Sequence, residues 1–422
     1  MPESAYGPTN NCVGIGNVLL ERGHRVVFAA EASWRGKLAP LGFVEDLVDL
    51  AEPPPPPTPG EPEPDAGQFW KDFVRSTAPE FRKPTIAQLD TFVRPVFEEL
   101  IAGARYCEPQ LREIIARHRP DVVIEDNVVV FPALQTGGAP YVRIVSCNPL
   151  EIKGSGVAPT FSGLPADDKD SWAGFRAEYE RTHRPLWQDF DAFVREQGAP
   201  GLPEMDFMPV SDRLNLYVYP EELDYVDARP LDGSWQRLES CVRTTDAPFE
   251  LPDRISTDGR PLAYFSLGSL GSADLELMQR TLDVLATTPY RFVVSMGPRD
   301  DELTLGENMW GSEFVPQTTL LPMVDLVITH GGNNTTTEAM HFGKPMVLLP
   351  IFWDQHDNAQ RVHERGYGVR LDTYRYTDDE MVQALRDMSA PEVRARAEAA
   401  GRRIRAADGV RRAAELIEAV AG

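Results

Sequence analysis

Short runs of apolar, mostly β-branched residues alternate along the chain with longer segments in which apolar residues recur at helical spacing. This alternation is typical of parallel strands covered by helices, because a strand buried on both faces needs a continuous apolar run. The first half of the chain contains runs at residues 25–30, 121–126, 141–146 and 214–219. The second half contains runs at residues 262–267, 291–295, 325–329 and 345–349. The pattern predicts an α/β fold with two Rossmann-like domains.

The length of the chain also favours two domains. Its 422 residues exceed what one apolar core supports, since single cores stop growing at about 250–300 residues. Residues 220–252 have few periodic apolar positions and many turn formers, so the connection between domains is expected there. We expect an N-terminal domain over residues 1–225, a linker over 226–250, a C-terminal domain over 251–405 and a terminal helix within 406–422.

Two local features complete the organisation. A doubly wound domain should open with a strand, yet this chain begins almost directly with a loop at residues 5–11 and a helix at 12–22. Either the first strand is missing or the numbering starts late. The proline run at residues 53–57, continuing to Pro64, lacks backbone donors and is expected to form an extended surface excursion.

Composition excludes several classes of partner. The formal net charge of −23 would repel a polyanion, so nucleic acid is not expected to bind. The sequence contains no apolar run of about 18 residues and no signal peptide, so we expect a cytoplasmic protein with no membrane partner. The four cysteines are far apart, which indicates neither a zinc site nor a disulfide framework.

One segment of the second half carries a pattern suited to binding an anion. The strand at 325–329 is followed by His330-Gly331-Gly332, and a helix is expected to begin at Thr335. Backbone N–H groups and the helix dipole would then meet a diphosphate just beyond the strand. His330, at the carboxyl end of that strand, could donate to a phosphate oxygen. Taken alone, Thr335 and Glu338 also fit a capping box, in which Glu338 only stabilises the start of its own helix.

The whole string around this turn resembles a known family. The segments 314–317 (FVPQ), 330–338 (HGGNNTTTE), 343–346 (GKPM) and 350–355 (PIFWDQ) resemble, in order and spacing, the donor-binding signature of glycosyltransferase family 1, the UDP-glycosyltransferases. Within that family the chain is most similar to the bacterial macrolide-type branch. The resemblance implies the GT-B arrangement, two Rossmann-like domains facing across a cleft, with the C-terminal helix crossing back to the N-terminal domain.

The resemblance also implies a role for each matched residue. Phe314 stands where the family usually has a tryptophan that stacks on the nucleobase, and phenylalanine keeps an aromatic face. The other implied donor contacts are Gln317 to the base or ribose, His330, Gly332, Asn334 and Thr335 to the diphosphate, Glu338 to the ribose hydroxyls, and Asp354 and Gln355 to the sugar ring. Ser269, in a Gly-Ser turn after an earlier strand, would donate to the β-phosphate.

The family's catalytic base is absent from its usual position. A histidine in the first loop normally removes the proton from the acceptor hydroxyl, and here Pro8 occupies that position. Proline has no proton-accepting side chain. Asp126, where the family has the aspartate that orients the histidine, is the candidate base, directly or through a water. Alternatively another residue such as Glu3, Tyr6 or Glu125 replaces the histidine, or the acceptor is acidic enough to need little help.

The implied activity is inverting transfer of a sugar from an NDP-sugar, such as UDP-glucose or a TDP-sugar, to a hydroxyl of a small hydrophobic acceptor. Phenols, polyketides or macrolides, and flavonoids are the acceptor types considered. Tyr6, Pro8 and Phe131 are candidates for the acceptor pocket. No cofactor and no metal are expected, since this family uses the helix dipole and side-chain donors instead. The alternatives are a nucleotide-sugar 2-epimerase and a non-catalytic nucleotide-sugar-binding protein.

Overall fold

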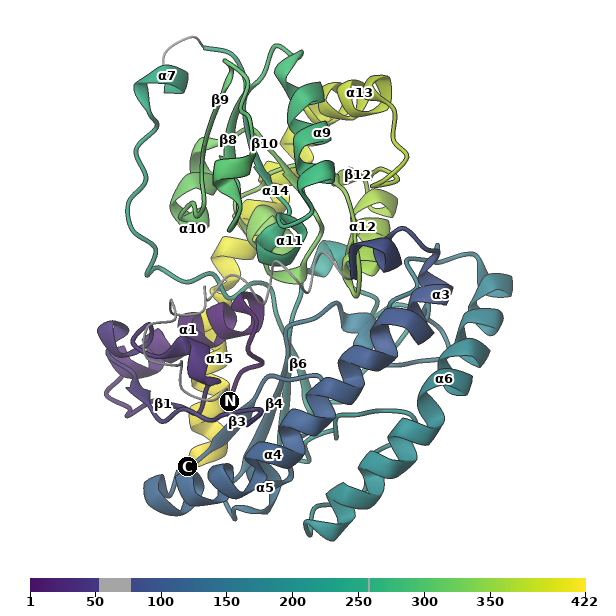
Figure 1. Ribbon diagram of the computed structural model, residues 1–422. Coiled ribbons are helices and arrows are strands. Elements are labelled where there is room, and N and C mark those ends of the chain that lie inside the picture. The colour runs from purple at the N-terminus through teal and green to yellow at the C-terminus, as the bar shows by residue number, and fades with distance from the viewer. Residues whose placement is uncertain (53–76, 257–258) are drawn as a thin grey trace, which may run out of the picture.

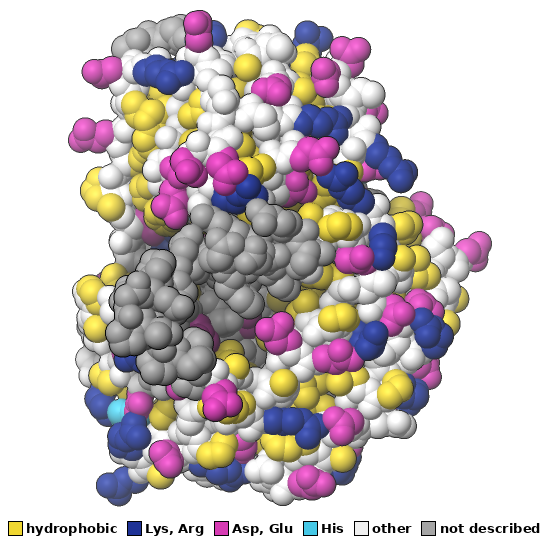
Figure 2. All heavy atoms as spheres, in the orientation of Figure 1, with side chains coloured by type: hydrophobic (Ala, Val, Ile, Leu, Met, Phe, Trp, Pro, Cys, Tyr) yellow, Lys and Arg dark blue, Asp and Glu magenta, His cyan; other side chains and the backbone are white. Residues whose placement is uncertain are grey.

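The computed structural model describes residues 1–52, 77–256 and 259–422 (Figure 1). The expected proline-rich excursion at 53–64 lies outside these ranges. Figure 1 shows two α/β halves, one above the other, with both chain ends in the lower, N-terminal half. On the face seen in Figure 2, acidic and basic side chains are interspersed over both halves. Among the described residues, no helix is both long enough and apolar enough to cross a membrane.

The C-terminal half is built on a six-stranded parallel sheet with the strand order β12-β11-β10-β7-β8-β9. Its strands are β7 (Leu262–Ser266), β8 (Arg291–Ser295), β9 (Met309–Ser312), β10 (Leu326–Thr329), β11 (Met346–Leu348) and β12 (Gly368–Arg370). Its longer helices are α9 (Leu275–Ala286), α11 (Asn333–His341), α12 (Gln355–Glu364), α13 (Asp378–Met388) and α14 (Pro391–Ala407). The strand order reverses between β7 and β10, so a ligand crevice is expected at the carboxyl ends of these two strands.

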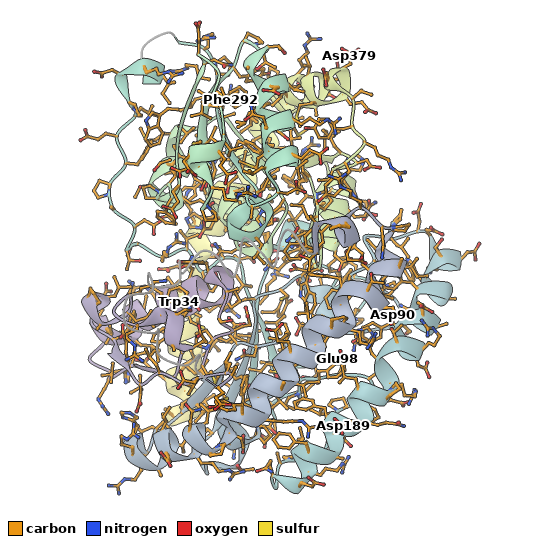
Figure 3. The ribbon with its side chains drawn as sticks, viewed as in Figure 1. Trp34, Asp90, Glu98, Asp189, Phe292 and Asp379 are labelled. Atoms are coloured by element: carbon orange, nitrogen blue, oxygen red, sulfur yellow. The ribbon has the colours of Figure 1, made fainter. Side chains whose placement is uncertain are left out.

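Large apolar side chains pack on the faces of this sheet. Phe292 on β8, labelled in Figure 3, and Phe265 on β7 are both fully buried, as the continuous apolar runs in the sequence predict.

The N-terminal half has a four-stranded parallel sheet with the order β3-β4-β5-β6 and a separate parallel pair, β1-β2. The strands are β1 (Val27–Phe28), β2 (Val44–Glu45), β3 (Val123–Glu125), β4 (Tyr141–Val145), β5 (Leu214–Val218) and β6 (Trp235–Leu238). The helices are α1 (Tyr6–Glu21), α3 (Thr85–Gln88), α4 (Arg94–His118), α5 (Pro132–Thr136) and α6 (Lys169–Glu196).

Residues 1–3 run alongside the end of β3. Pro2 forms an isolated parallel bridge with Asp126, whose N–H donates to the Met1 carbonyl at 3.0 Å. The Glu3 N–H donates in turn to the Asp126 carbonyl at 2.7 Å. Residues 1–3 therefore occupy the position of a strand next to β3.

Every strand expected from an apolar run is present, and four short ones, β2, β6, β9 and β12, were not anticipated. These strands are two to four residues long and contain Glu, Gly, Arg or Gln, so they lack the apolar signature. β6 corrects the expected linker at 226–250, since Trp235–Leu238 belongs to the N-terminal sheet. Two helices also begin earlier than expected, α1 at Tyr6 and α11 at Asn333.

The C-terminal helix α15 (Gly409–Ala421) crosses back and packs on α1, β5 and β6 of the N-terminal half, as the resemblance implied. Its Glu418 accepts hydrogen bonds from Arg22 and His24 at the end of α1, so His24 has a structural role. Arg403 on α14 pairs with Glu222 and Glu239 of the N-terminal half at 2.6 Å each. These polar contacts and the passage of the chain from α14 through Asp408 into α15 thus join the two halves.

Candidate active site

The amino end of α11 presents free backbone donors between the two halves. Gly332 is the N-cap residue, and no side chain caps the helix. The N–H groups of the first turn therefore lack partners within the helix, and the positive end of its dipole is uncovered. Asn333, Asn334 and Thr335 form this turn at the carboxyl end of β10. The capping-box interpretation is wrong, because Thr335 lies inside the helix and Glu338 bonds to other groups.

His330 is enclosed by two glycines. A Cβ added to Gly332 would lie 2.5 Å from the Nε2 atom of His330, and one added to Gly268 would lie 2.8 Å from its Cε1 atom. Gly268 also has φ +72°, which favours glycine. Burial lowers the pKa of His330 to about 4, and a hydrogen bond with the Ser266 backbone opposes the shift. The ring is therefore neutral near pH 7 and offers a single N–H donor.

Glu338 is buried and accepts hydrogen bonds from three side chains. Arg243 and Asn334 donate to its Oε1 atom at 2.8 and 3.1 Å, and Gln317 donates to its Oε2 atom. Burial raises the pKa of Glu338, while the charge of Arg243 lowers it. Arg243 is itself held by Asp246 through two bonds of 2.8 Å. The structure therefore adds a carboxylate-holding arginine to the residues expected from the sequence.

Phe314 and Gln317 lie at the rim of this site. Phe314 follows β9, and its 64% exposure is the highest among the exposed large hydrophobic residues. Such a ring is free to stack on a planar ligand. Gln317 begins the short helix α10 (Gln317–Leu320) and bridges to Glu338. Ser269 belongs by its backbone to α8 (Gly268–Gly271), and its side chain is outside the described part of the chain.

Asp354 and Gln355, at the start of α12, are engaged in different ways. The Oδ2 atom of Asp354 accepts from the backbone N–H of Asn148, in the N-terminal half, at 2.8 Å. Burial raises the pKa of Asp354 to about 7. The Oε1 atom of Gln355 accepts from the backbone of Ile351 and Phe352, so its amide nitrogen is the group left for a ligand.

Asp357, one turn further along α12, contacts the other half in the same way. Its two carboxylate oxygens accept from the N–H groups of Phe161 and Gly163 at 2.6 and 2.8 Å. The start of α12 and the loop at 148–163 are thus joined by direct hydrogen bonds.

Asp126 follows β3 and is 3% exposed. Its Oδ2 atom accepts from the Ser146 hydroxyl at 2.6 Å and from the Cys12 thiol at 3.7 Å. Burial raises the pKa of Asp126 to about 7, and the Ser146 hydrogen bond opposes the shift. A carboxyl with such a pKa can accept a proton near neutral pH.

Ser146 and Asn333 connect the Asp126 carboxyl to helix α11. The Ser146 hydroxyl accepts from Asn11 of α1 at 3.0 Å, and the Ser146 carbonyl accepts from Asn333 of α11 at 2.8 Å. Asn333 also donates to the Val218 carbonyl at the end of β5. Hydrogen bonds through one intervening residue, Ser146, therefore link Asp126 to the amino end of α11. Ser146 was discoverable from the sequence, since it directly follows a strand; Asn11 and Arg243 carry no such signal.

The remaining expected residues separate into two groups. Gly7 lies beside Asn334, so the first turn of α1, which includes Pro8, abuts α11. Tyr6, 48% exposed, packs on Trp34 next to this turn. Phe131, by contrast, is 3% exposed in the core beneath α5, which argues against its expected place in the acceptor pocket.

The structure also shows where the alternative candidate bases lie. Glu125 is fully buried and accepts from the Tyr141 hydroxyl at 2.7 Å and the Phe131 N–H at 2.9 Å. Because neighbouring strand residues point to opposite faces, Glu125 faces the core while Asp126 does not. Glu3 accepts from Ser4 and the Ala5 N–H beside α1. Of the alternatives from the sequence, Glu125 therefore has a structural role.

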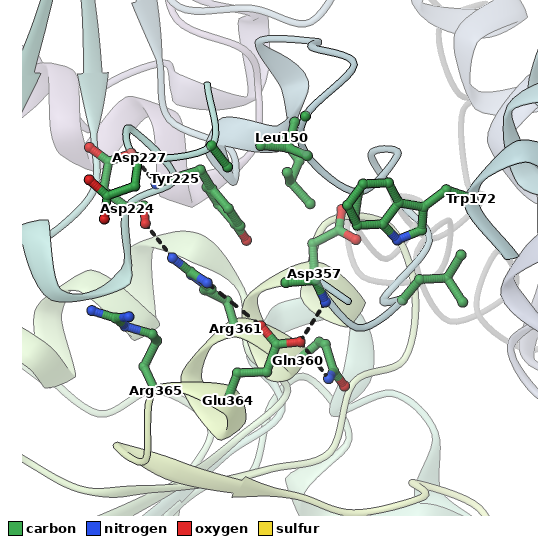
Figure 4. A pocket seen from close by; sticks show the side chains of 16 residues that line it. Leu150, Trp172, Asp224, Tyr225, Asp227, Asp357, Gln360, Arg361, Glu364 and Arg365 are labelled. Carbon is green, nitrogen blue, oxygen red and sulfur yellow. Dashed lines mark hydrogen bonds and ion pairs between the residues drawn. The ribbon is translucent and has the colours of Figure 1, made fainter. Parts of the chain in front are cut away.

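A separate cavity of about 240 Å³ lies between the two halves (Figure 4). It is bounded by Leu150, Trp172 and Tyr225 on one side and by Arg361 and Glu364 of α12 on the other. Arg361 donates to the Leu223 carbonyl at 2.7 Å and lies over the Tyr225 ring. The residues with expected donor or catalytic roles do not line this cavity.

Comparison with known proteins agrees with this geometry. The family model "UDP-glucoronosyl and UDP-glucosyl transferase" matches residues 239–393. The NDP-glycosyltransferase YjiC of Bacillus subtilis is 26% identical over 74% of this chain and 75% of its own length. The oleandomycin glycosyltransferase of Streptomyces antibioticus is 24% identical over 99% of this chain and 89% of its own.

Solved structures give the same result. The crystal structure of the glycotransferase of kitacinnamycin superimposes with a TM-score of 0.71 at 25% identity, covering 98% of this chain and 96% of that one. The calicheamicin glycosyltransferase CalG4 has a TM-score of 0.66 at 19% identity over 99% of this chain and 96% of its own, which supports the fold. The family match and these relatives together support a bacterial glycosyltransferase similar to glycosyltransferase family 1, and the solved neighbours show the GT-B fold.

Proposed function

We propose that the protein transfers a sugar from a nucleoside-diphosphate sugar to a hydroxyl of a small natural-product acceptor, with inversion at the anomeric carbon. The observation that supports this most is the convergence of α11, Asp126 and Asp354 at one junction between the halves. An in-line displacement needs a base and a donor on opposite sides of the acceptor oxygen.

The donor is held mainly by the C-terminal half. The diphosphate lies at the free N–H groups of α11, with His330 as a neutral donor. The ribose hydroxyls donate to Glu338, which exchanges its bond from Gln317 or Asn334 for them. Phe314 stacks on the base, and the amide nitrogen of Gln355 donates to the sugar ring. As the β-phosphate leaves, these donors stabilise its growing charge without reorganisation.

Asp126 is the general base in this proposal. Within the described residues, both hydrogen bonds to its carboxyl reach Oδ2, so Oδ1 is available to the acceptor hydroxyl. Its pKa of about 7 lets it accept the proton as the acceptor oxygen attacks. Ser146 orients the Asp126 carboxyl and is itself held by Asn11. No histidine is needed to orient this carboxyl, and Pro8 stands at the usual histidine position.

The names of two relatives support the proposed acceptor class. One relative is named for oleandomycin and one structural neighbour for kitacinnamycin, and both cover nearly the whole chain. We extend this to the present chain as a small, largely apolar aglycone bound in the N-terminal half. Apolar acceptors suit the aromatic side chains between α4, α6 and the loop at 148–163.

The test is a mass-spectrometric screen of UDP- and TDP-sugars against phenols, macrolides and flavonoids. We expect one hexose to be added to at least one acceptor, and NMR of the product to show a β-glycoside from an α-linked donor. An α-glycoside would contradict inversion. Incubation of the donor without acceptor addresses the alternative 2-epimerase activity, for which an epimerised donor would be the evidence.

A further inference from the structure

A second, smaller cavity lies in the N-terminal half between α4, α6 and the loop at 148–163. Its volume is about 20 Å³, enough for one oxygen-sized polar group. Aromatic rings form much of its wall, namely Phe97, Phe161, Tyr179 and Phe207. The Phe97 and Phe207 rings are 4.5 Å apart, and the Phe161 and Trp353 rings are also 4.5 Å apart, with their planes tilted by 46°.

Two buried polar groups in this wall have no partner within the described structure. The Thr160 hydroxyl and the Nε atom of Arg143 make no hydrogen bond, although these residues are only 6% and 4% exposed. An unsatisfied buried polar group costs roughly 1–3 kcal/mol, so such groups are rare unless a ligand satisfies them. Both groups can donate a hydrogen bond, which selects a ligand atom that accepts.

The charges in the wall are already balanced. Arg143 pairs with Glu151 at 3.1 Å, and Lys153 pairs with Asp206 at 2.6 Å. Each cation therefore has its carboxylate. A further carboxylate from a ligand would be buried without compensation, and such burial is costly. The acceptor atom that fits best is therefore neutral.

Backbone strain is concentrated around the same cavity. Phe161, Met205 and Trp353 have φ of +68°, +60° and +58°, in the left-handed region that bulky residues rarely adopt. Phe161 lines the cavity, the Met205 carbonyl accepts from Lys153, and Trp353 packs on Phe161. Strain of this kind persists where the surroundings enforce it, commonly at ligand sites.

The cavity is lined by residues that neighbour the proposed catalytic junction. Val128 in its wall lies two residues after Asp126, and Glu151 in its wall is close enough to influence the Asp126 carboxyl electrostatically. On the other side, Trp353 precedes Asp354, the residue expected at the donor sugar. Chain neighbours of the base candidate and of the expected sugar contact therefore lie at this cavity, Val128 in its wall and Trp353 against Phe161.

We propose that this cavity recognises a neutral carbonyl oxygen on the glycosyl acceptor, through Thr160 and Arg143, and that the preferred acceptors are aryl ketones, quinones or related conjugated carbonyl compounds. The inference rests on the proposed function, since it specifies the acceptor of that transfer. The aromatic side chains of the wall contact the conjugated ring of the acceptor. The Arg143 Nε–H and the Thr160 hydroxyl donate to its carbonyl oxygen.

The experiment compares two phenols of similar size, 4-hydroxyacetophenone and 4-ethylphenol, which differ by the carbonyl group. Affinity for the full chain, saturated with UDP, is measured by calorimetry or ligand-observed NMR. We expect the ketone to bind about threefold to tenfold more tightly, the value of one or two hydrogen bonds. Thr160→Val should reduce this preference to less than about twofold, because valine keeps the shape and removes the donor.

Thr160→Ser is the matched control and should keep the preference for the ketone. Thr160→Val removes no hydrogen bond of the free protein, so we expect it to fold normally, as its thermal melting will show. Equal affinity for the two phenols, a preference unchanged in Thr160→Val, or no binding of either phenol would overturn the proposal.

Sugar transfer is measured separately with the same two phenols. Transfer to both phenols with equal kcat/KM would support the proposed function and overturn this inference. A ketone preference in binding that Thr160→Val abolishes, without transfer to either phenol, would support the inference and count against the proposed function.

Discussion

The two halves of the molecule form their parts of the site in different ways. The C-terminal half uses backbone: the first turn of α11, its glycine neighbours and one neutral histidine between them. The N-terminal half uses side chains from distant segments, such as Asn11, Asp126 and Ser146. A backbone site needs a fixed local order of residues, whereas a side-chain site needs only that residues meet in space. The first kind can be recognised as a motif within one chain segment, and the second can tolerate a replacement such as Pro8.

The largest effect should follow a change in the side-chain half. We expect Asp126→Asn to lower kcat by at least about a hundredfold, since it removes the proton acceptor while keeping the shape. UDP affinity, measured by calorimetry, should stay unchanged because the donor site is in the other half. Asp121→Asn, an exposed residue before the same strand, is the control and should behave as the unmodified protein. Turnover close to normal in Asp126→Asn would exclude Asp126 as the base.

The next largest effect should be a difference in pH dependence between catalysis, assigned to the N-terminal half, and donor affinity, assigned to the C-terminal half. Because burial raises the pKa of Asp126 to about 7, the carboxyl is protonated and inactive as a base at lower pH. We expect kcat/KM to rise about tenfold per pH unit up to a plateau above about pH 7, in the absence of other limiting groups. In an Asp354→Asn background, UDP-glucose affinity should be flat over this range, since the carboxyl expected at the donor sugar, whose pKa is also about 7, is removed and His330, with a pKa of about 4, stays neutral. A rise in donor affinity that parallels kcat/KM would argue against assigning the titration to Asp126.

In the backbone half, Glu338 is the side chain with the largest expected contribution. Glu338→Ala should weaken UDP binding by about tenfold or more, the value of a charge-assisted hydrogen bond to the ribose. At saturating donor, kcat should fall much less. Glu398→Ala, on the exposed face of α14, serves as the control. Unchanged UDP affinity in Glu338→Ala, measured by calorimetry, would remove Glu338 from the donor site.

The smallest effect is expected at the rim. Phe314→Ala should weaken UDP binding about threefold to tenfold, because an aromatic pair contributes about 0.5–1.5 kcal/mol. Phe314→Trp should strengthen binding slightly by adding stacking area. Met323→Ala, another exposed large hydrophobic residue, should leave the affinity unchanged. If Met323→Ala matched Phe314→Ala in its effect, stacking at Phe314 would not be the cause.

The difference between adjacent and distant residues also determines which features can be predicted from the sequence. The longer strands follow from buried apolar runs, and the turn around His330 follows from residues adjacent in the chain. β6 was missed because Trp-Gln-Arg-Leu carries no continuous apolar run. Arg243 was missed because its partner Glu338 is 95 positions away and no local pattern connects them.

Placement in the acceptor half was harder still. Asp126 was expected from its match to the family's aspartate, whereas the adjacent Glu125 stayed open as a base until its contact with Tyr141 was known. Phe131 was expected in the pocket because acceptor selection in the family lies in the N-terminal half, but the side chain is buried in the core at the start of α5. The burial of Glu125 and Phe131 depends on packing between segments that are not adjacent in the chain.

The hydrogen bonds between α12 and the loop at 148–163 have a consequence for protein engineering. Asp354 and Asp357 accept backbone N–H groups of Asn148, Phe161 and Gly163, so α12 is fitted to one particular course of the loop at 148–163. A chimera that joins this N-terminal half to the C-terminal half of a relative would leave these buried carboxyls facing a loop of different shape. Functional chimeras should therefore exchange α12 together with residues 148–163, even though the two segments are far apart in the sequence.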